Sequence, residues 1–491
     1  MKKLLLLTAA ALMSASVYAQ HEQIHLFQSK DFKSFKAEEV EKMEYLGQNG
    51  EFSQLVLTDT LGKVTKVDMS LIDSVVLRTN GIPEFHVTLQ DYPNWPELGQ
   101  NGESKDVIHQ ATLYMNGNGM YDDVKAQTVE FRGRGNSTWG MRKKPYRFKM
   151  AKKASVCGLP KAKTFALIAN NIDCSLMRNT IALWLANYLE MPYSNHCVPV
   201  KVYFNGTYKG QYMLTEKIGI GGGSVDIDET TGMLFELDSN YDEDYKFTYT
   251  WRPSGSYYGS KTLPVMVKDP DLAELAADTT VTNITDAYSY FNLWKTDFTK
   301  MADAVTQRSA SQSLSDVLDL ESVVEFFLVN GIANNHEMQH PKSLYIHKKS
   351  LEEGEVYHFG PVWDFDWAFT FDGREGASPT AYLVAQDGEQ SGYSFLKALL
   401  SNEEIRTMFR EKLNDFYTNG YPMLKEYIEE YANLIEPTAK ENGQLWPSYS
   451  HASWCVVTSS WEFRNNVETL KKWIDDRINF MLTDANFGLY K

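Results

Sequence analysis

The sequence is poor in cysteine, in positive charge and in long apolar runs. Only four of its 491 residues are Cys, and none stands at the CxxC spacing of a structural zinc site. With 48 Lys and Arg against 64 Asp and Glu, the net charge of −16 excludes a general nucleic-acid-binding surface, because phosphate contacts need a basic face. Beyond the N-terminal segment no stretch approaches the roughly 18 apolar residues of a transmembrane helix, so we expect no membrane span in the mature chain.

The sequence also has no internal repeat of fixed period and no low-complexity tract. Its hydrophobic share of 43% and aromatic share of 13% are typical of a globular protein with large cores and exclude a disordered chain. The length predicts two or three domains.

The N-terminus has the pattern of a targeting segment. Lys2 and Lys3 precede an apolar run that ends in a small-x-small pattern at Ala19. This predicts a signal peptide over residues 1–19. The alternative is a membrane anchor, for which the run is too short and too rich in Ala and Ser. We therefore expect the mature protein to be exported to the periplasm or the cell surface.

The cysteines leave two arrangements open. The chain is expected to be exported and has an even number of cysteines: Cys157, Cys174, Cys197 and Cys455. Two disulfides with three possible pairings are therefore permitted. Buried thiols are the alternative.

The first region, residues 20–80, is predicted to be a small β-rich module. Residues 52–56 and 64–69 alternate like strands around a turn at 58–62, and residues 71–77 are a third strand candidate. No residue pattern in this region points to chemistry, so we expect a structural or docking role.

Residues 84–375 are predicted to form an α+β core. Asn205-Gly206 separates two strand-like runs and predicts a tight β-hairpin. Asp173 and Asp319 are each placed to cap a helix. Residues 219–260 are rich in Gly, Ser, Asp and Tyr, so we expect a long loop or insertion there.

Residues 395–491 are predicted to be a helical C-terminal lobe of the same core. Ser401 with Glu404 fits a capping box at the start of one helix. Residues 467–481 carry apolar side chains at helical spacing. Together the three regions predict an α+β fold.

A cluster of basic residues, the basic island, is the first candidate site. It comprises Arg132, Arg134, Lys143, Lys144, Arg147 and Lys149. Gly133 and Gly135 let backbone amides approach a ligand, and clustered N–H groups with arginine suit phosphate. Arg147 and Lys149 would share one face of a strand. The alternative is a solvated strand face paired with surface carboxylates.

Two carboxylates in an aromatic segment form the second candidate site. Asp364 and Asp366 alternate with Trp363, Phe365 and Trp367. Carboxylates are rarely buried without a partner or a metal, and an extended segment would direct both to the same side. Two oxygen ligands at this spacing suit magnesium. The alternative is one helix cap and one buried ion pair.

Two further polar segments follow predicted regular elements. Residues 334–342 follow an apolar helix, and loops in such places commonly carry sites. His336, Glu337 and His340 resemble HExxH, but flanking Asn and Pro argue against the continuing helix that this zinc motif needs. Glu216-Lys217 ends the predicted hairpin, where it is either a surface ion pair or, through the lysine, a phosphate ligand.

These segments carry a resemblance to a known family. Six segments stand in one order over roughly residues 84–375: RGRGNSTW, KKPYRFKM, FALIANNIDCSLMRN, VKVYFNGTYKGQYMLTEKI, NNHEMQHPKSLYIHKK and PVWDFDWAF. This combination resembles the CotH (spore coat protein H) kinase family, and the helical C-terminal part is similar too. The resemblance implies a diverged protein-kinase-like core that binds ATP and magnesium.

The resemblance also implies roles for individual residues. Asp364 would hold the metal, with Asp366 beside it, and Glu337 stands where the family has its proposed catalytic Asp. The residues expected to contact the nucleotide are Arg134, Lys144, Lys149, Glu216, Lys217, Asn335 and Lys342. The implied reaction is magnesium-assisted transfer of a γ-phosphoryl group to Ser or Thr of a protein outside the cytoplasm.

Three alternatives to this reaction stay open, because ATP is scarce outside a bacterial cytoplasm. The first is an exported pseudokinase that binds another ligand. The second is a surface or periplasmic protein that binds polysaccharide, for which the 11 Trp and 28 Tyr would be suited. The third is a two-carboxylate glycosidase, which would leave the basic island unexplained.

Overall fold

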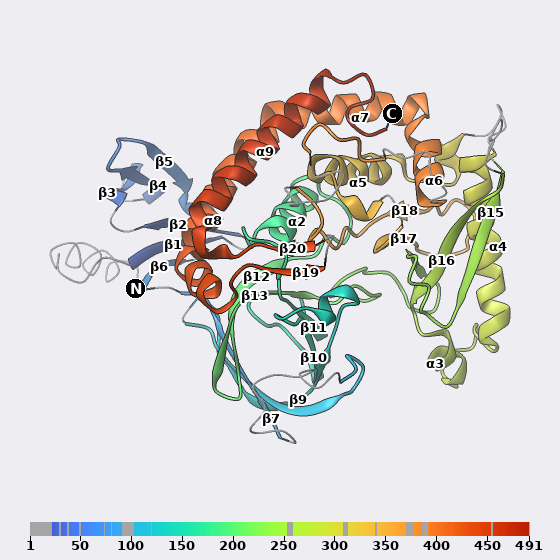
Figure 1. The fold of residues 1–491 in the computed structure, drawn as a ribbon, viewed down its shortest axis with the longest axis horizontal. Helices are drawn as coiled ribbons and strands as arrows, with labels where there is room; N and C mark the ends of the chain where they lie inside the picture. Colours follow the sequence, from blue (N-terminus) through green and yellow to red (C-terminus); the bar gives the residue numbers. More distant parts are fainter. Residues whose placement is uncertain are drawn as a thin grey trace.

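The computed structural model describes residues 22–490, except 29–30, 37–38, 49–50, 73, 80, 91–102, 119, 253–258, 308–312, 339–340, 370–377, 385–390 and 453–454. The expected signal peptide therefore lies outside the described residues. The predicted α+β class is confirmed, because sheets and helices are both extensive (Figure 1). None of the described helices is long and apolar enough to cross a membrane.

The N-terminal region contains two three-stranded antiparallel sheets. One has the order β2-β1-β6 and the other β3-β4-β5. Their strands are β1 (Glu22–Gln28), β2 (Asp31–Lys36), β3 (Val40–Gln48), β4 (Glu51–Asp59), β5 (Val64–Asp68) and β6 (Ser74–Thr79). The predicted strand at 52–56 is confirmed as part of β4, and the one at 64–69 is confirmed as β5 except for Met69, which begins a 3-10 turn. β4 and β5 pair with each other. The third candidate strand begins at Ser74 and pairs with β1.

A closed barrel of seven strands, which the sequence did not predict, follows these sheets. Its order is β10-β11-β13-β12-β7-β8-β9. The strands are β7 (Glu84–Leu89), β8 (His109–Asn116), β9 (Val124–Gly133), β10 (Tyr146–Ala154), β11 (Ala162–Ile168), β12 (Cys197–Phe204) and β13 (Thr207–Glu216). Buried aromatic and aliphatic side chains, among them Phe85, Phe131 and Phe165, pack together as one core. Regular alternation of buried and exposed residues along β8 gives it one face for this core and one for solvent.

The predicted Asn-Gly hairpin is confirmed as the connection between β12 and β13. Asn205 and Gly206 have φ angles of 46° and 78°, the left-handed conformation that a two-residue type I′ turn needs. The Asn205 side chain also accepts a hydrogen bond from the Leu89 amide at 2.9 Å.

A second sheet of five strands has the order β15-β16-β14-β17-β18. Its strands are β14 (Met233–Leu237), β15 (Lys246–Trp251), β16 (Lys261–Asp269), β17 (Leu344–Lys348) and β18 (His358–Phe359). The prediction of a long loop over 219–260 is therefore wrong. β14 lies at the centre of the sheet with all five residues buried, but its apolar run is short and flanked by polar turns.

Helices cover the second sheet and extend across the molecule. α3 (Leu272–Ala277) and α4 (Ala287–Thr306) follow β16 (Figure 1). Phe291 and Phe298 of α4 pack on Phe247 of β15. The other helices are α2 (Arg178–Tyr188), α5 (Leu320–Ala333), α6 (Ser391–Leu400), α7 (Glu403–Asp415), α8 (Tyr421–Leu445) and α9 (Phe463–Thr483). A short hairpin of β19 (Tyr449–Ala452) and β20 (Cys455–Val457) lies between α8 and α9.

The structure confirms one predicted helix cap and corrects two. Asp319 caps α5 by accepting a hydrogen bond from the Ser322 amide. α7 is capped by Asn402 and not by Ser401, because the Asn402 side chain accepts from the Glu404 and Ile405 amides. α2 begins only at Arg178, although Asp173 accepts a hydrogen bond from the Arg178 amide at 2.8 Å.

The cysteines are mostly buried. Cys157, Cys174 and Cys455 are each at most 9% exposed. Burial raises the pKa of the Cys157 thiol, so this side chain behaves as a small apolar group.

The buried guanidinium of Arg477 connects the helical lobe to the rest of the molecule. It donates from Nε to the Gly331 carbonyl at 2.7 Å, from Nη2 to Gly488 at 3.0 Å and from Nη1 to Pro379 at 3.1 Å. Burial lowers its pKa to about 9, and the side chain stays cationic at neutral pH.

We therefore predict that Arg477→Met lowers the free energy of unfolding by about 2–4 kcal/mol, because it leaves buried carbonyls without donors. Chemical denaturation followed by circular dichroism measures this change. Lys472→Met on the same helix is the control: its side chain is 74% exposed and pairs with Asp476, so we expect a change below about 0.5 kcal/mol. Equal effects of the two variants on the free energy of unfolding would contradict the stabilising role of the Arg477 hydrogen bonds.

Candidate active site

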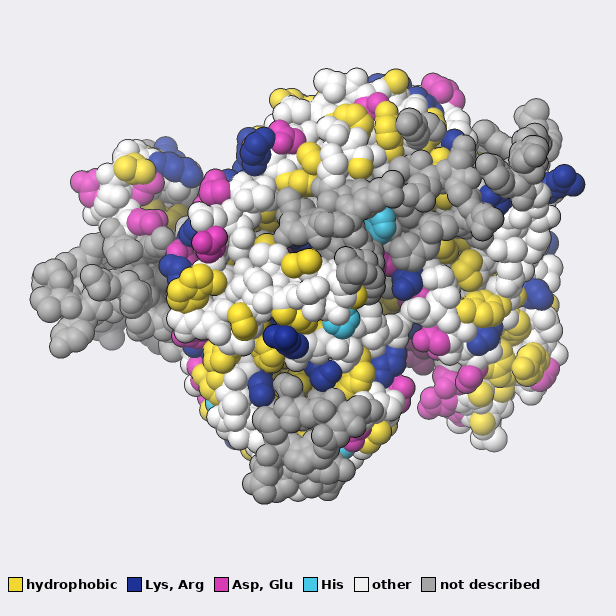
Figure 2. All heavy atoms as spheres, viewed as in Figure 1, with side chains coloured by type: hydrophobic (Ala, Val, Ile, Leu, Met, Phe, Trp, Pro, Cys, Tyr) yellow, Lys and Arg dark blue, Asp and Glu magenta, His cyan; other side chains and the backbone are white. Residues whose placement is uncertain are grey.

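A cavity of 380 Å³ lies between the barrel and the second sheet. One wall comes from the ends of β9 and β13 and from β10 and β11. The other comes from β14, the segment before β17 and the segment after β18. Seen from outside, basic side chains gather over the barrel, and acidic side chains lie across the boundary to the second sheet and α3 (Figure 2).

The barrel wall of the cavity is basic. Arg134 directly follows β9, Arg147 lies on β10, and Lys217 directly follows β13. Burial, together with Arg132 and Arg134, lowers the pKa of Arg147 to about 10. Burial also lowers the pKa of Lys217. Neither Arg147 nor Lys217 makes an ion pair within the part of the chain that the structure describes, so both charges are available to an anion.

Local backbone geometry places Arg134 at this wall. Its amide donates to the Pro145 carbonyl at 3.2 Å, which joins the end of β9 to the start of β10. Gly133 packs under the Trp139 ring, where a Cβ would lie 2.4 Å from a ring carbon. Gly135 has a φ of +78°, a conformation that favours glycine. The two glycines of RGRG are therefore required by close packing and by the turn.

The opposite wall carries the two predicted carboxylates. Asp364 and Asp366 both line the cavity. The predicted extended geometry is wrong, since Asp364 has a φ of 62° and the segment forms no strand. Burial raises the pKa of Asp364, and the positive charges of Arg134 and Lys342 oppose this rise. Burial, then Asp364 and Asp173, raise the pKa of Asp366 to about 7.

The second sheet adds carboxylates to the same wall. Glu236 accepts a hydrogen bond from the Tyr345 hydroxyl at 2.8 Å and lies 2.8 Å from the Lys268 ammonium. Asp238 accepts from the amides of Asn240 and Ser343, and burial raises its pKa to about 6. Both residues belong to β14 or directly follow it.

The polar segment after α5 also reaches the cavity. Asn334 ends α5 in a left-handed conformation, so the continuous helix that an HExxH zinc site needs is interrupted here. Glu337 is buried in a short 3-10 turn and lines the cavity, as does Lys342. Asn335 accepts from the Glu337 amide at 3.2 Å and donates to the Asp364 carbonyl at 3.4 Å. His340 lies outside the described residues.

Four predicted nucleotide contacts are not among the residues that line the main cavity: Asn335, Lys144, Lys149 and Glu216. The Lys144 ammonium donates to the carbonyls of Trp139 and Met141 and lines a neighbouring groove. Lys149 is 49% exposed and lies 3.8 Å from Glu130. Glu216 is buried, accepts from the His196 amide at 3.0 Å, and therefore makes no surface ion pair with Lys217.

The Lys143 side chain, also part of the basic island, binds buried groups of the fold and does not line the cavity. Its ammonium donates to the carbonyls of Ala169, at 2.7 Å, and Gln211, and it lies 4.6 Å from the Tyr212 ring centre. Burial lowers its pKa to about 7. Only part of the basic island therefore faces the cavity.

A comparison with protein-family models shows the family to which the chain belongs. The model described as CotH kinase protein matches residues 129–481, which is more than half of the chain. The chain belongs to the CotH kinase family. A search of curated proteins found no match. The CotH match begins in β9 and ends in α9, so it includes both walls of the cavity and the C-terminal helices.

Sequence reasoning missed several residues that the CotH fold brings to the cavity. They are Glu236, Asp238, Lys268 and Asn179. The first two were hidden by the wrong loop prediction, since a five-residue strand gives little periodic signal. Asn179 stands in FALIANNIDCSLMRN, a segment of the family resemblance, but nothing in its spacing marks it as part of a site. Arg147 was included in the basic island without being chosen as a ligand.

The barrel wall gives a direct test. We predict that Arg147→Ala weakens binding of tripolyphosphate roughly tenfold, because one charge-assisted contact is lost. Calorimetric titration of the anion measures this affinity. Lys149→Ala is the matched control: it removes a cation two residues along the same strand but outside the cavity. An equal loss for the two variants would mean that the anion responds to overall charge and not to this wall.

Proposed function

We propose that this CotH family member is an atypical kinase with a diverged protein-kinase-like core. It would bind a magnesium nucleotide in the cavity and transfer a phosphoryl group to Ser or Thr of a protein. The observation that carries this proposal is the pairing of two walls. Arg147 and Lys217, cations without an ion pair in the described structure, face the partly buried Asp364 and the buried Asp366 across one cavity.

The carboxylate wall fits a magnesium ion. Asp364 and Asp366 both line the cavity and are oxygen donors of the kind this ion prefers. Burial, and after it the charge of Asp364, raises the pKa of Asp366. A divalent cation between them would relieve this repulsion. Asp364 is the primary ligand in our proposal and Asp366 the second. The bound ion would neutralise charge on the transferring phosphoryl group.

The basic wall fits the nucleotide phosphates. Arg134, Arg147 and Lys217 present charge-assisted donors on one side of the cavity. Lys342, on the other side, places a positive charge near the proposed metal ligands, and this charge opposes the rise that burial causes in the pKa of Asp364. A two-carboxylate glycosidase would have no use for this group of cations. A polysaccharide-binding surface would not need them either.

Glu337 is the proposed general base. It is buried and lines the same cavity as the metal ligands. The acceptor hydroxyl oxygen forms a bond to the γ-phosphorus while the bond from that phosphorus to the bridging oxygen breaks. The hydroxyl proton goes to the Glu337 carboxylate, and the nucleoside diphosphate leaves. We also propose, from the signal-peptide pattern, that the acceptor lies in the periplasm or at the cell surface.

A pseudokinase is the second candidate, and one observation favours it. Glu337 occupies the position at which the family resemblance places a catalytic Asp. Its additional methylene changes the reach of the carboxylate, and a general base must be within hydrogen-bond distance of the hydroxyl. The cavity would then bind a nucleotide or another anion without transfer.

Nucleotide binding tests the function itself. We predict that ATP binds the mature chain more tightly with magnesium than without it, because Asp364 and Asp366 would hold the ion and the ion would neutralise phosphate charge. Isothermal calorimetry measures both affinities. Asp364→Ala should remove the magnesium dependence while leaving magnesium-free binding close to that of the wild type. Absence of ATP binding in every condition would rule out the nucleotide site.

Glu337 variants separate the kinase from the pseudokinase. If Glu337 is the base, Glu337→Gln should keep magnesium-dependent ATP binding and slow phosphate transfer by about 10²–10⁴-fold. Transfer to a mixture of envelope proteins is followed with γ-labelled ATP. Glu337→Asp, which restores the residue of the family pattern, should remain active. Activity in Glu337→Asp but none in the wild-type chain would identify the natural protein as a pseudokinase.

A further inference from the structure

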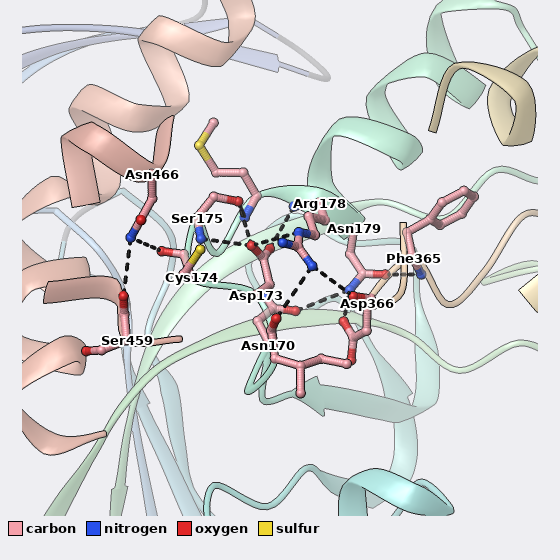
Figure 3. Close-up of polar contacts among 12 residues, drawn as sticks. Asn170, Asp173, Cys174, Ser175, Arg178, Asn179, Phe365, Asp366, Ser459 and Asn466 are labelled. Carbon is pink, nitrogen blue, oxygen red and sulfur yellow. Dashed lines mark hydrogen bonds and ion pairs between the residues drawn. The ribbon is translucent and has the colours of Figure 1, made fainter. Parts of the chain in front are cut away.

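The side chain of Asn179 holds two consecutive residues of the carboxylate segment. Its Nδ2 donates to Oδ1 of Asp366 at 2.6 Å, and its Oδ1 accepts from the Phe365 amide at 2.9 Å (Figure 3). Asn179 lies in the first turn of α2 and is 6% exposed. One carboxamide therefore binds both the backbone and a carboxylate of a segment that follows it by 186 positions.

This contact matters because the segment is irregular. Residues 361–365 form no helix or strand, so no ladder of hydrogen bonds fixes the direction of the Asp364 side chain. Individual side chains do so instead. Asn335 donates to the Asp364 carbonyl and Arg178 donates to the Asp366 carbonyl at 3.1 Å. The Asn179 contact reaches a carboxylate of the proposed metal pair, that of Asp366, while Ser343 makes a side-chain hydrogen bond to Asp364.

Asn179 itself is held rigidly at the start of α2. The Asp173 carboxylate accepts from the amides of Ser175 and Arg178, both at 2.8 Å. Asn466 of α9 donates to the Cys174 carbonyl at 3.1 Å and to Ser459 at 3.2 Å, and so ties this turn to the helical lobe (Figure 3). A buried, anchored carboxamide can fix its partners more firmly than a mobile surface side chain can.

We propose that Asn179 is a positioning residue for the divalent cation. It occupies Oδ1 of Asp366 and thereby leaves Oδ2 as the oxygen available to the ion. Through the Phe365 amide it also fixes the peptide next to Asp364. The side chain must donate and accept at once, which a carboxamide does and a carboxylate or an apolar group does not. This inference rests on the proposed function, because the cation is the proposed magnesium ion.

Two measurements on Asn179→Ala test the proposal. Titration with Mn²⁺ in the absence of nucleotide, followed by electron paramagnetic resonance, should show cation affinity reduced roughly 10–100-fold, as for other residues that orient metal ligands. Hydrogen exchange of the Phe365 amide should become faster, because its acceptor is gone. Tripolyphosphate affinity should stay close to that of the wild type, since the basic wall is unchanged.

Asn187→Ala is the matched control. Asn187 lies on the same helix, is not among the residues that line the cavity, and donates hydrogen bonds to the carbonyls of Leu183 and Asn195. It should lower thermal stability without changing Mn²⁺ affinity or Phe365 exchange. If Asn179→Ala does not fold, Asn179→Leu, which keeps a side chain of similar size but can neither donate nor accept, is measured with the same readouts.

The outcomes separate the two proposals. Unchanged Mn²⁺ affinity and unchanged Phe365 exchange in a folded Asn179 variant would overturn the positioning role. Equal losses of Mn²⁺ and tripolyphosphate affinity would also overturn it, because they would indicate a general structural defect. A wild-type chain that binds no Mn²⁺ would overturn both the magnesium site and the role of Asn179 in it, whereas failure of phosphate transfer alone would leave the positioning role intact.

Discussion

The arrangement of the site depends on the cost of burying carboxylates close together. Asp364 and Asp366 line one wall of a cavity with Asp173 nearby, and burial, then the charges of Asp364 and Asp173, raise the pKa of Asp366. Buried charges of one sign are unfavourable unless cations or hydrogen-bond donors surround them. The fold supplies both kinds of compensation: Arg134 from the barrel and Asn179 from α2. A divalent ion would complete this compensation.

The architecture explains how such different groups meet. The ends of barrel strands carry the cations, and the second sheet with the segments before β17 and after β18 carries the carboxylates. The C-terminal region closes the assembly around this boundary. The Tyr449 hydroxyl accepts from the Arg142 amide at 3.2 Å and from Asn171 at 3.0 Å, while Val457 and Cys455 pack with Trp367. The CotH match accordingly includes this hairpin and extends into α9, to residue 481.

Local features were predictable from the sequence and distant contacts were not. The Asn205-Gly206 turn and the Asp319 cap depend on neighbours in the chain, and the structure confirms both. Closure of the barrel, the central position of β14 and the Asn179 contact join segments far apart in sequence, so no local pattern reveals them. For the site, composition pointed to Asp364 and Asp366, which share the cavity, but spacing alone could not separate Arg147, inside the cavity, from Lys149, outside it.

The most direct test of the account is a crystal structure of the mature chain with Mn²⁺ and a non-hydrolysable ATP analogue. We predict an anomalous manganese peak within about 2.2 Å of an Asp364 oxygen, with the phosphates against Arg147 and Lys217. A nucleotide bound elsewhere, or a cavity in which Asp364 and Asp366 contact no metal under these conditions, would contradict the assignment of this cavity as the active site.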